Sequence, residues 1–334
     1  MRLLNVDGVH LDIVKVESFR PPYPPYLILS HTWSQDPDEE VSFHDVHDGE
    51  LHYFEKKAWR KKVRGFCKVA KNVGYSYVWI DTCCIDEASS AEVGEAINLM
   101  YAWYQSAVAC FVHLEDISRD RGGMVVFENS ERFKSKPPRW FTRGWTLQEL
   151  VAPKKLYFFD QHWHRLGSRS QLAGAVRTFT GIPLDVLHGK DPHEYPLDVR
   201  WSWSRGRETT KPEDQAYSLI GLLGINMSLV YGIPAKGALE LLENAVRERY
   251  SRDSFGSGSL HSTMADRLRQ IDSQRLAKSQ AKHIGYGDRG DDDDEENDVD
   301  DDDDDGDEND YDDDDEGLSI LVSVLGIGDP RRRR

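Results

Sequence analysis

The sequence predicts an α/β fold in which a mostly parallel sheet is flanked by helices. Four short apolar runs, rich in aromatic and β-branched side chains, occupy residues 26–30, 75–81, 108–116 and 155–159. Such continuous runs are typical of strands that are covered on both faces. Helix-like segments separate the first three runs. Strands that alternate with helices indicate βαβ units and therefore parallel pairing.

The two segments between these strands carry recognisable helix signals. Residues 61–74 place apolar side chains at helical spacing and end at Gly74, a residue that commonly stops helices. Residues 89–107 carry one apolar stripe. At its start, Ser89 and Glu92 have the spacing of a capping box, which predicts the helix start there.

Beyond residue 160 the pattern becomes mainly helical, with the clearest helices expected at 212–225 and 234–250. Residues 117–138 are weakly periodic and are expected to form a loop or insertion. A polar, low-complexity stretch begins near residue 251. We therefore expect the folded part to cover residues 1–250, and residues 251–334 to form a disordered acidic tail.

The net charge of −17 comes mainly from this tail. Residues 291–316 hold 21 of the 59 acidic residues, and the remaining 38 nearly balance the 42 lysines and arginines. A solvated tail is the simplest interpretation, although contact with a basic partner remains an alternative. The N-terminus lacks the apolar core of a signal peptide. No run reaches the roughly 18 apolar residues that a membrane span requires. A cytoplasmic protein without a stable membrane anchor is expected.

Polar residues gather where the predicted strands end, at "SHTW", "DTCCID", "HLED" and "FFDQHWH". Ligands of parallel α/β sheets bind beyond the carboxyl ends of the strands, so this edge is the expected site. Gly-rich phosphate loops and the GxSxG and HExxH motifs are absent from the sequence. His162 and His164 have no matching third ligand, and Cys83 and Cys84 would face apart in an extended chain. No metal is therefore predicted.

Two groups of residues allow both a structural and a functional interpretation. Ser30, His31 and Trp33 form either a turn after a buried strand or a surface that hydrogen-bonds and stacks on a ligand. Glu149 follows Thr146 with capping-box spacing, with Trp145 and Leu150 placed as a hydrophobic staple, which favours a helix cap. A carboxylate at the rim of the sheet is the alternative.

Four stretches together resemble the HET (heterokaryon incompatibility) domain of filamentous fungi. They are "YLILSHTW", "YVWIDTCCIDEASSAEVGEAINLMYAWYQSA", "RWFTRGWTLQELVAPKKLYFFD" and "GRETTKPEDQAYSLIGLLGINMSLVYG". The resemblance covers about residues 1–245 and keeps the order of the motifs. Members of this family act in non-self recognition, in which incompatible partners trigger programmed death of the fused cell.

The resemblance implies a TIR-like, flavodoxin-like sheet, because HET domains are regarded as relatives of TIR domains. The TIR-like core would span about residues 25–165 and a helical extension about 166–250. On this correspondence Glu149 falls on the glutamate that TIR enzymes use to cleave NAD. The resemblance further implies a pocket lined by six residues: Ser30, His31, Trp33, Asp81, Arg143 and Trp145. Glu92 is the alternative carboxylate, although its capping position favours a structural role.

The implied activity is cleavage of NAD as a substrate, without a metal or a tightly bound cofactor. Departure of the cationic nicotinamide needs no general acid, and one carboxylate can stabilise the oxocarbenium-like state. Self-association and death-pathway partner proteins are expected, and nucleic acid is not. The alternative is a non-enzymatic TIR-like adaptor that signals through homotypic protein contacts, with Glu149 as a cap only.

Overall fold

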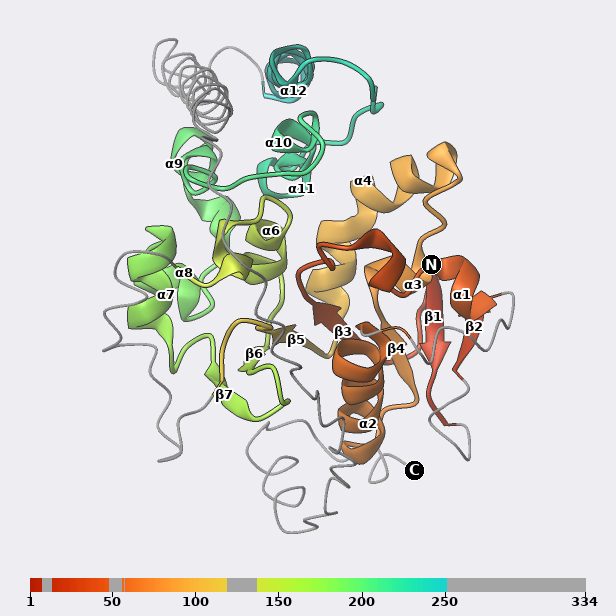
Figure 1. Ribbon diagram of the computed structural model, residues 1–334. Coiled ribbons are helices and arrows are strands. Elements are labelled where there is room, and N and C mark those ends of the chain that lie inside the picture. Colours follow the sequence, from red (N-terminus) through yellow and green to blue (C-terminus); the bar gives the residue numbers. More distant parts are fainter. Residues whose placement is uncertain (8–13, 48–55, 57, 119–136, 251–334) are drawn as a thin grey trace, which may run out of the picture.

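A seven-stranded mixed sheet forms the centre of the protein, in the order β2-β1-β4-β3-β5-β6-β7 (Figure 1). The computed structural model describes residues 1–7, 14–47, 56, 58–118 and 137–250. The strands are β1 (Arg2–Asn5), β2 (Lys15–Ser18), β3 (Leu27–Ser30), β4 (Tyr77–Trp79), β5 (Ala109–His113), β6 (Leu156–Phe159) and β7 (Arg165–Ser168). The expected tail at 251–334 and most of the expected loop at 117–138 lie outside the described residues.

The four strands expected from the apolar runs are confirmed, each slightly shorter than its run. They pair in parallel in the order β4-β3-β5-β6. Strand β3 is therefore the point where the topology changes direction, because the next strand in sequence lies on one side and the third lies on the other. Strands β3, β5 and β6 are buried along their whole length. Parallel strands covered on both faces need this continuous apolar character.

Three antiparallel strands outside the parallel unit, namely β1 and the two edge strands β2 and β7, were not expected from the sequence. Strand β2 pairs with β1, β1 pairs with β4, and β7 pairs with β6. Each is four residues long, and both β2 and β7 contain polar or half-exposed positions. The edge strands β2 and β7 bury less side-chain surface than central ones, so they lack an identifying run of apolar residues. Strand β1 buries only its two middle leucines, which is too short a run to indicate a strand.

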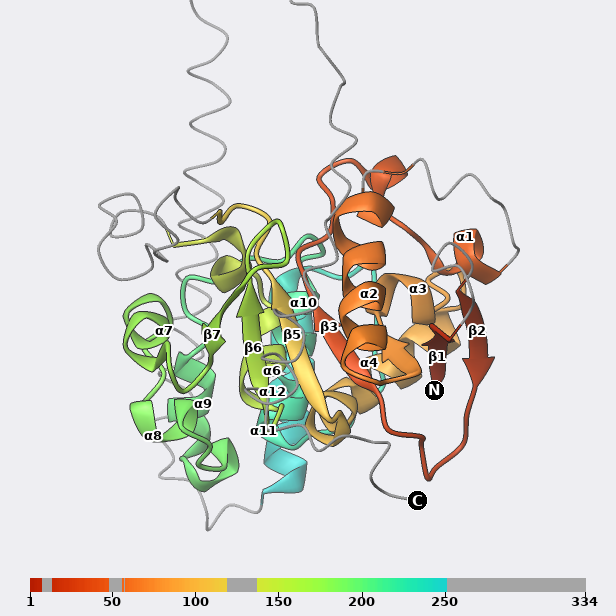
Figure 2. The ribbon, with the colours of Figure 1, turned by 90° about the horizontal axis from the view of Figure 1, so that it is seen from below.

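Helices cover both faces of the sheet. Those before β6 are η1 (Pro37–Glu39), α1 (Phe43–His47), η3 (Trp59–Val63), α2 (Arg64–Asn72), α3 (Asp81–Cys84), α4 (Ser90–Ser106), η4 (Arg139–Thr142) and α6 (Thr146–Val151). Helix α2 lies on one face, while α4 and α6 lie on the other (Figure 2). Ring contacts agree, since Phe66 of α2 meets Phe111 with centroids 5.8 Å apart, and Trp103 of α4 meets Trp79 at 5.7 Å.

The predicted start of α4 is confirmed, whereas its capping box is only half formed. The Ser89 hydroxyl accepts a hydrogen bond from the backbone N–H of Glu92 (3.4 Å). The Glu92 carboxylate, however, pairs with the Arg2 guanidinium and accepts from the Asp86 backbone N–H (2.9 Å). Glu92 therefore ties the start of α4 to strand β1. The two adjacent cysteines, Cys83 and Cys84, lie in the short helix α3 and not in an extended segment.

After β7 the described chain continues through helices. They are α7 (Ala173–Thr180), α8 (Leu184–Leu187), η5 (Pro192–Glu194), α9 (Leu197–Ser202), α10 (Asp214–Tyr217), α11 (Ile220–Leu223) and α12 (Ala235–Arg249). The expectation of α12 is confirmed. The single helix expected at 212–225 is wrong, because the backbone leaves regular helix between α10 and α11 and turns at Gly224 with a φ of +70°.

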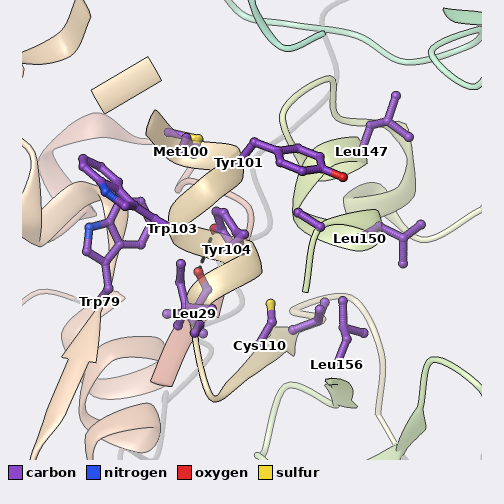
Figure 3. Packing of buried hydrophobic residues seen from close by; sticks show 14 of the residues in the cluster. Leu29, Trp79, Met100, Tyr101, Trp103, Tyr104, Cys110, Leu147, Leu150 and Leu156 are labelled. Carbon is purple, nitrogen blue, oxygen red and sulfur yellow. Dashed lines mark hydrogen bonds between the residues drawn. The ribbon is translucent and has the colours of Figure 1, made fainter. Parts of the chain in front are cut away.

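The core between the sheet and the α4/α6 layer is rich in large side chains. Figure 3 shows α4 and α6 above strands β3, β5 and β6, with the ring of Tyr101 extending from α4 toward α6. There the hydroxyl of Tyr104 donates to the carbonyl of Leu29 (2.9 Å), which ties α4 to the central strand. Gly221 lets α11 approach this layer closely, because a Cβ at that position would lie 2.3 Å from Tyr101 Cβ.

All four cysteines are buried and free. None of the helices within the described ranges is both long and apolar enough to cross a lipid bilayer.

Candidate functional site

Glu149 lies against the carboxyl end of the central strand β3. Its side chain is buried, with only 5% of the residue exposed. The Ser30 hydroxyl donates to Glu149 Oε2 (2.5 Å). Ser30 in turn accepts a hydrogen bond from the indole Nε1 of Trp140 (2.8 Å). The only proton of the hydroxyl is thereby directed at the carboxyl group, and the contact joins α6 to the point where the sheet topology changes direction.

The protonation state of Glu149 follows from this environment. Burial raises the pKa of its carboxyl to about 8, and the negative charge of Asp81 contributes in the same direction. The hydrogen bond from Ser30, the neighbouring hydroxyl of Tyr104 and the positive charge of Arg207 oppose the rise. At neutral pH the neutral carboxyl therefore predominates, and the carboxylate forms as the pH passes through about 8.

The interpretation of Glu149 as a helix cap is wrong. Helix α6 begins with Trp145 in the capping position, in helical conformation and without a side-chain cap. Thr146 is already inside the helix, and its hydroxyl hydrogen-bonds to the carbonyls of Trp140 (2.6 Å) and Arg143 (2.9 Å). Because the helix starts one residue earlier than the capping box requires, Glu149 is free to turn toward the sheet.

A second group, formed by His31, Trp33 and Asp81, lies at the rim of the same edge. The imidazole Nε2 of His31 donates to Asp81 Oδ1 (2.9 Å), and the indole Nε1 of Trp33 donates to Asp81 Oδ2 (2.7 Å). Burial acts to raise the pKa of Asp81. The adjoining His31 and the two hydrogen bonds outweigh that effect and lower the pKa, so the carboxylate stays ionised. Trp33 is 46% exposed and offers an aromatic face to solvent.

A buried ion pair holds the loop that carries His31 and Trp33. The ammonium group of Lys62 donates to Glu40 Oε2 (2.7 Å) and to the carbonyl of Thr32 (3.1 Å). The same Glu40 oxygen accepts from the backbone N–H of Ser34 (2.7 Å). Both charged side chains are buried. The turn after β3 is therefore fixed by charged groups from outside it.

Arg143 and Trp145 lie apart from the other expected site residues. The Arg143 guanidinium donates to Thr210 Oγ1 (2.7 Å), and the Trp145 indole donates to Asp214 Oδ2 (3.1 Å). Arg143 thus contacts the segment between α9 and α10, and Trp145 contacts the first residue of α10. The other five expected residues form two adjoining groups, Ser30 with Glu149 and Asp81 with His31 and Trp33. The groups interact electrostatically, because the charge of Asp81 raises the pKa of Glu149.

Three residues around Glu149 were not expected from the sequence. They are Tyr104, Trp140 and Arg207. Tyr104 belongs to the apolar stripe of α4, where a hydroxyl gives no separate signal. Trp140 and Arg207 fall inside the motif stretches quoted above, yet residue spacing does not reveal that a tertiary contact brings them to Glu149.

The histidines after β6 build a turn. The buried carboxylate of Asp160 accepts from the backbone N–H groups of His162 (2.9 Å) and His164 (2.8 Å), and its second oxygen contacts His164 Nδ1 (3.1 Å). Within the described residues, no three or more histidine, cysteine or acidic side chains are grouped so as to hold a metal ion.

The arrangement around Glu149 has a definite chemical capacity. A carboxylate at this position can accept hydrogen bonds from ligand hydroxyls and can offset a positive charge. It lies where the sheet changes direction, which is where ligands of open α/β sheets bind. The exposed indole of Trp33 at the rim can stack on a planar ring.

Comparison with known proteins agrees with the family resemblance. Residues 26–139 match the sequence profile of the heterokaryon incompatibility protein (HET) family. The chain is also 41% identical, over 230 residues, to the vegetative incompatibility protein HET-E-1 of Podospora anserina. That match covers 69% of this chain and 16% of the relative, so the chain spans about a sixth of the relative's length. No solved structure matches the chain. The chain therefore contains a domain of the heterokaryon incompatibility (HET) family.

Proposed function

We propose that the protein is a cytosolic effector of fungal non-self recognition that triggers cell death by cleaving NAD. The heterokaryon incompatibility role is supported by the family profile and by the name of the relative, a vegetative incompatibility protein. Death-pathway or incompatibility proteins would be its partners. A TIR-like, flavodoxin-like core is consistent with the parallel strand order β4-β3-β5-β6. The four strands follow the order 2-1-3-4 when numbered along the chain, which is the start of the flavodoxin-like order.

The observation that carries the enzymatic part is the placement of Glu149. Its carboxyl group is buried beside Ser30 at the carboxyl end of β3, near the His31–Asp81 group. In the proposed reaction the carboxylate binds the ribose hydroxyls of NAD and stabilises the oxocarbenium-like state. The ribosyl C–N bond breaks with its electron pair going to the pyridinium ring, so nicotinamide leaves as a neutral molecule without protonation. Water then attacks the ribosyl carbon and loses a proton to solvent, which gives ADP-ribose. Trp33 offers the aromatic face for a planar ring, and self-association would bring a second protomer to the rim.

The proposal predicts a specific pH dependence. Only the ionised form of Glu149 performs this role, and its pKa is raised to about 8. The value of kcat/KM should therefore rise with pH and level off above about pH 8, because this quantity reports ionisation in the free enzyme.

The experiment is NAD consumption by the purified full-length protein at high concentration, wild type beside E149Q. Glutamine keeps the shape of the neutral acid and the acceptor for Ser30, so the fold should survive. We expect a loss of about 100-fold or more, the magnitude typical of removing one stabilising group. NAD cleavage at equal rates by both proteins would refute the assignment of Glu149.

The burial of Glu149 favours one other candidate, a non-enzymatic TIR-like adaptor. A neutral, hydrogen-bonded carboxyl that is only 5% exposed also suits a purely structural group. An adaptor would trigger cell death through homotypic contacts, and E149Q would leave both self-association and cell death intact. Measuring self-association and cell death beside NAD consumption separates the two functions.

A further inference from the structure

Arg207 is buried beside the beginning of α6, although it is distant from that helix in sequence. Only 2% of the residue is exposed. Backbone pairing brings its segment there: the N–H of Gly144 donates to the carbonyl of Glu208 (2.8 Å), and the N–H of Glu208 donates to the carbonyl of Thr142 (2.6 Å). A Cβ at Gly144 would lie 2.4 Å from the Thr209 side chain, so glycine allows this close approach.

A chain of contacts leads from Arg207 to Glu149, and in it the covalent frame of Trp140 joins a hydrogen bond at its backbone carbonyl to another at its indole. Arg207 Nη1 donates to Thr146 Oγ1 (2.9 Å), and that hydroxyl contacts the carbonyl of Trp140 (2.6 Å). The indole of Trp140 donates to Ser30 Oγ (2.8 Å), and Ser30 donates to Glu149 Oε2 (2.5 Å). Displacement of the Arg207 guanidinium would therefore shift Trp140 and, through its indole, the Ser30 hydroxyl that faces the Glu149 carboxyl group.

The charge of Arg207 has no explanation in α6 itself. A cation beside the first turn of a helix opposes the positive end of the helix dipole. Taking a guanidinium out of water costs several kcal/mol unless an anion offsets it. Burial lowers the pKa of Arg207 to about 9, and the negative charge of Glu149 is the influence that opposes this effect. At neutral pH the guanidinium remains protonated, and its charge acts on Glu149.

Groups from several elements face Glu149, and Arg207 is the cation among those that affect its ionisation. The titratable or charged ones are Asp81 of α3, Tyr104 of α4, Cys110 of β5 and Arg207. Asp81 carries a charge of the same sign as the carboxylate, and the other two are neutral groups with raised pKa values. Arg207 thus supplies the positive charge that favours the carboxylate.

We infer that Arg207 is a positioning residue for Glu149, which holds the hydrogen-bond chain to Ser30 and favours the ionised form of the carboxyl group. Its catalytic consequence rests on the proposed function, whereas the coupling between the two residues is a property of the fold. Arg207 itself touches no reacting atom in this proposal and acts through its neighbours.

The first test is a double-mutant cycle of E149Q and R207Q in the full-length protein, followed by urea unfolding. At about pH 8.5 we expect a coupling of about tenfold or more in the unfolding equilibrium constant. At about pH 5, where Glu149 is neutral, the coupling should fall below about threefold. Coupling that is absent, or equal at both pH values, would overturn the inference.

The second test is the pH profile of NAD cleavage. R207Q should move the midpoint of kcat/KM upward by about one pH unit, which lowers the value near pH 7 about tenfold, while KM for NAD changes less than about threefold. T146V interrupts the hydrogen-bond chain without altering charge, and should shift the midpoint in the same direction by less. Should R207Q fail to fold, T146V still decides the question. A T146V midpoint equal to that of the wild type would contradict the inference.

The two proposals fail in different ways. If the wild type consumes no NAD but the cycle shows pH-dependent coupling, the proposed function is wrong and the pairing of Arg207 with Glu149 stands. If the wild type consumes NAD and the variants show neither coupling nor a shifted profile, the proposed function stands and the role of Arg207 is refuted.

Discussion

Replacement of Glu149 by glutamine should make the protein progressively more stable than the wild type as the pH rises. In an unfolded chain this carboxyl ionises near its ordinary pKa of 4.5, whereas in the folded protein it stays protonated up to about 8. Between these pH values the folded state binds a proton that the unfolded state has released. The contribution of Glu149 to stability is therefore present below pH 4.5 and is lost as the pH rises through about 8.

The magnitude follows from the width of that interval. Each pH unit between the two pKa values corresponds to about 1.4 kcal/mol, so the interval sets an upper limit of about 5 kcal/mol. Glutamine mimics the neutral acid and has no such dependence. We expect E149Q and wild type to have similar free energies of unfolding near pH 5 and to differ by about 2 to 5 kcal/mol near pH 9.

The assay is urea unfolding of both full-length proteins at intervals from about pH 5 to about pH 9, followed by tryptophan fluorescence. Other titrating groups are shared by the two proteins and cancel in the difference. E240Q, on the exposed side of α12, is the matched control and should run parallel to the wild type. Parallel curves for E149Q and wild type would show that Glu149 ionises normally in the fold, and the reasoning about its burial would be wrong.

Three further experiments test the packing and charges of the fold. Asp81→Asn removes the negative charge that raises the pKa of Glu149. When the urea series is repeated in proteins that carry this change, the difference in free energy of unfolding between the E149Q form and the form that keeps Glu149 should grow less with pH than it does with Asp81 present. An unchanged difference would contradict the effect of Asp81 on Glu149. Gly221→Ala should lower the free energy of unfolding by about 1 to 3 kcal/mol, because the new Cβ would overlap a tyrosine of α4. Gly94→Ala is the control: the space around its Cβ is open, so this change should raise the free energy of unfolding by about 0.5 to 1 kcal/mol. Equal effects of the two alanines would argue against close packing of α11. Lys62→Met should cost about 3 to 5 kcal/mol in unfolding measurements because Glu40 stays buried without its cation, and a second change, Glu40→Gln, should restore part of the loss.

The central part of the fold could be predicted because burial leaves a direct mark on the sequence. Strands β3, β5 and β6 are covered on both faces, so every position is apolar except Ser30 and His113, the last residues of β3 and β5. The edge strands β2 and β7 carry no such mark, because most of their side chains are half-buried or exposed. The strand-end rule also located Ser30, His31 and Asp81, because the carboxyl ends of parallel strands meet at one edge of the sheet.

Residue spacing was insufficient where a tertiary contact decides the local structure. Thr146 and Glu149 have the spacing of a capping box, yet the helix starts at an earlier residue and the carboxyl group turns inward. Residue spacing shows that Glu149 could cap the helix, but it does not show that the hydroxyl of Ser30 competes for the same carboxyl group. Arg207 could not be found for the same reason, because its neighbourhood depends on the backbone pairing of Gly144 with Glu208.

That pairing has a consequence for the order in which the protein is made. Arg207 and Thr146, which are joined by a hydrogen bond, are 61 positions apart in the chain. During synthesis the central strands and α6 leave the ribosome well before residue 207 does. Until then the beginning of α6 lacks its guanidinium and its backbone partner. A truncated translation product would therefore carry Glu149 without the groups that orient it, and completion of the chain past Glu208 is a condition for assembling the site.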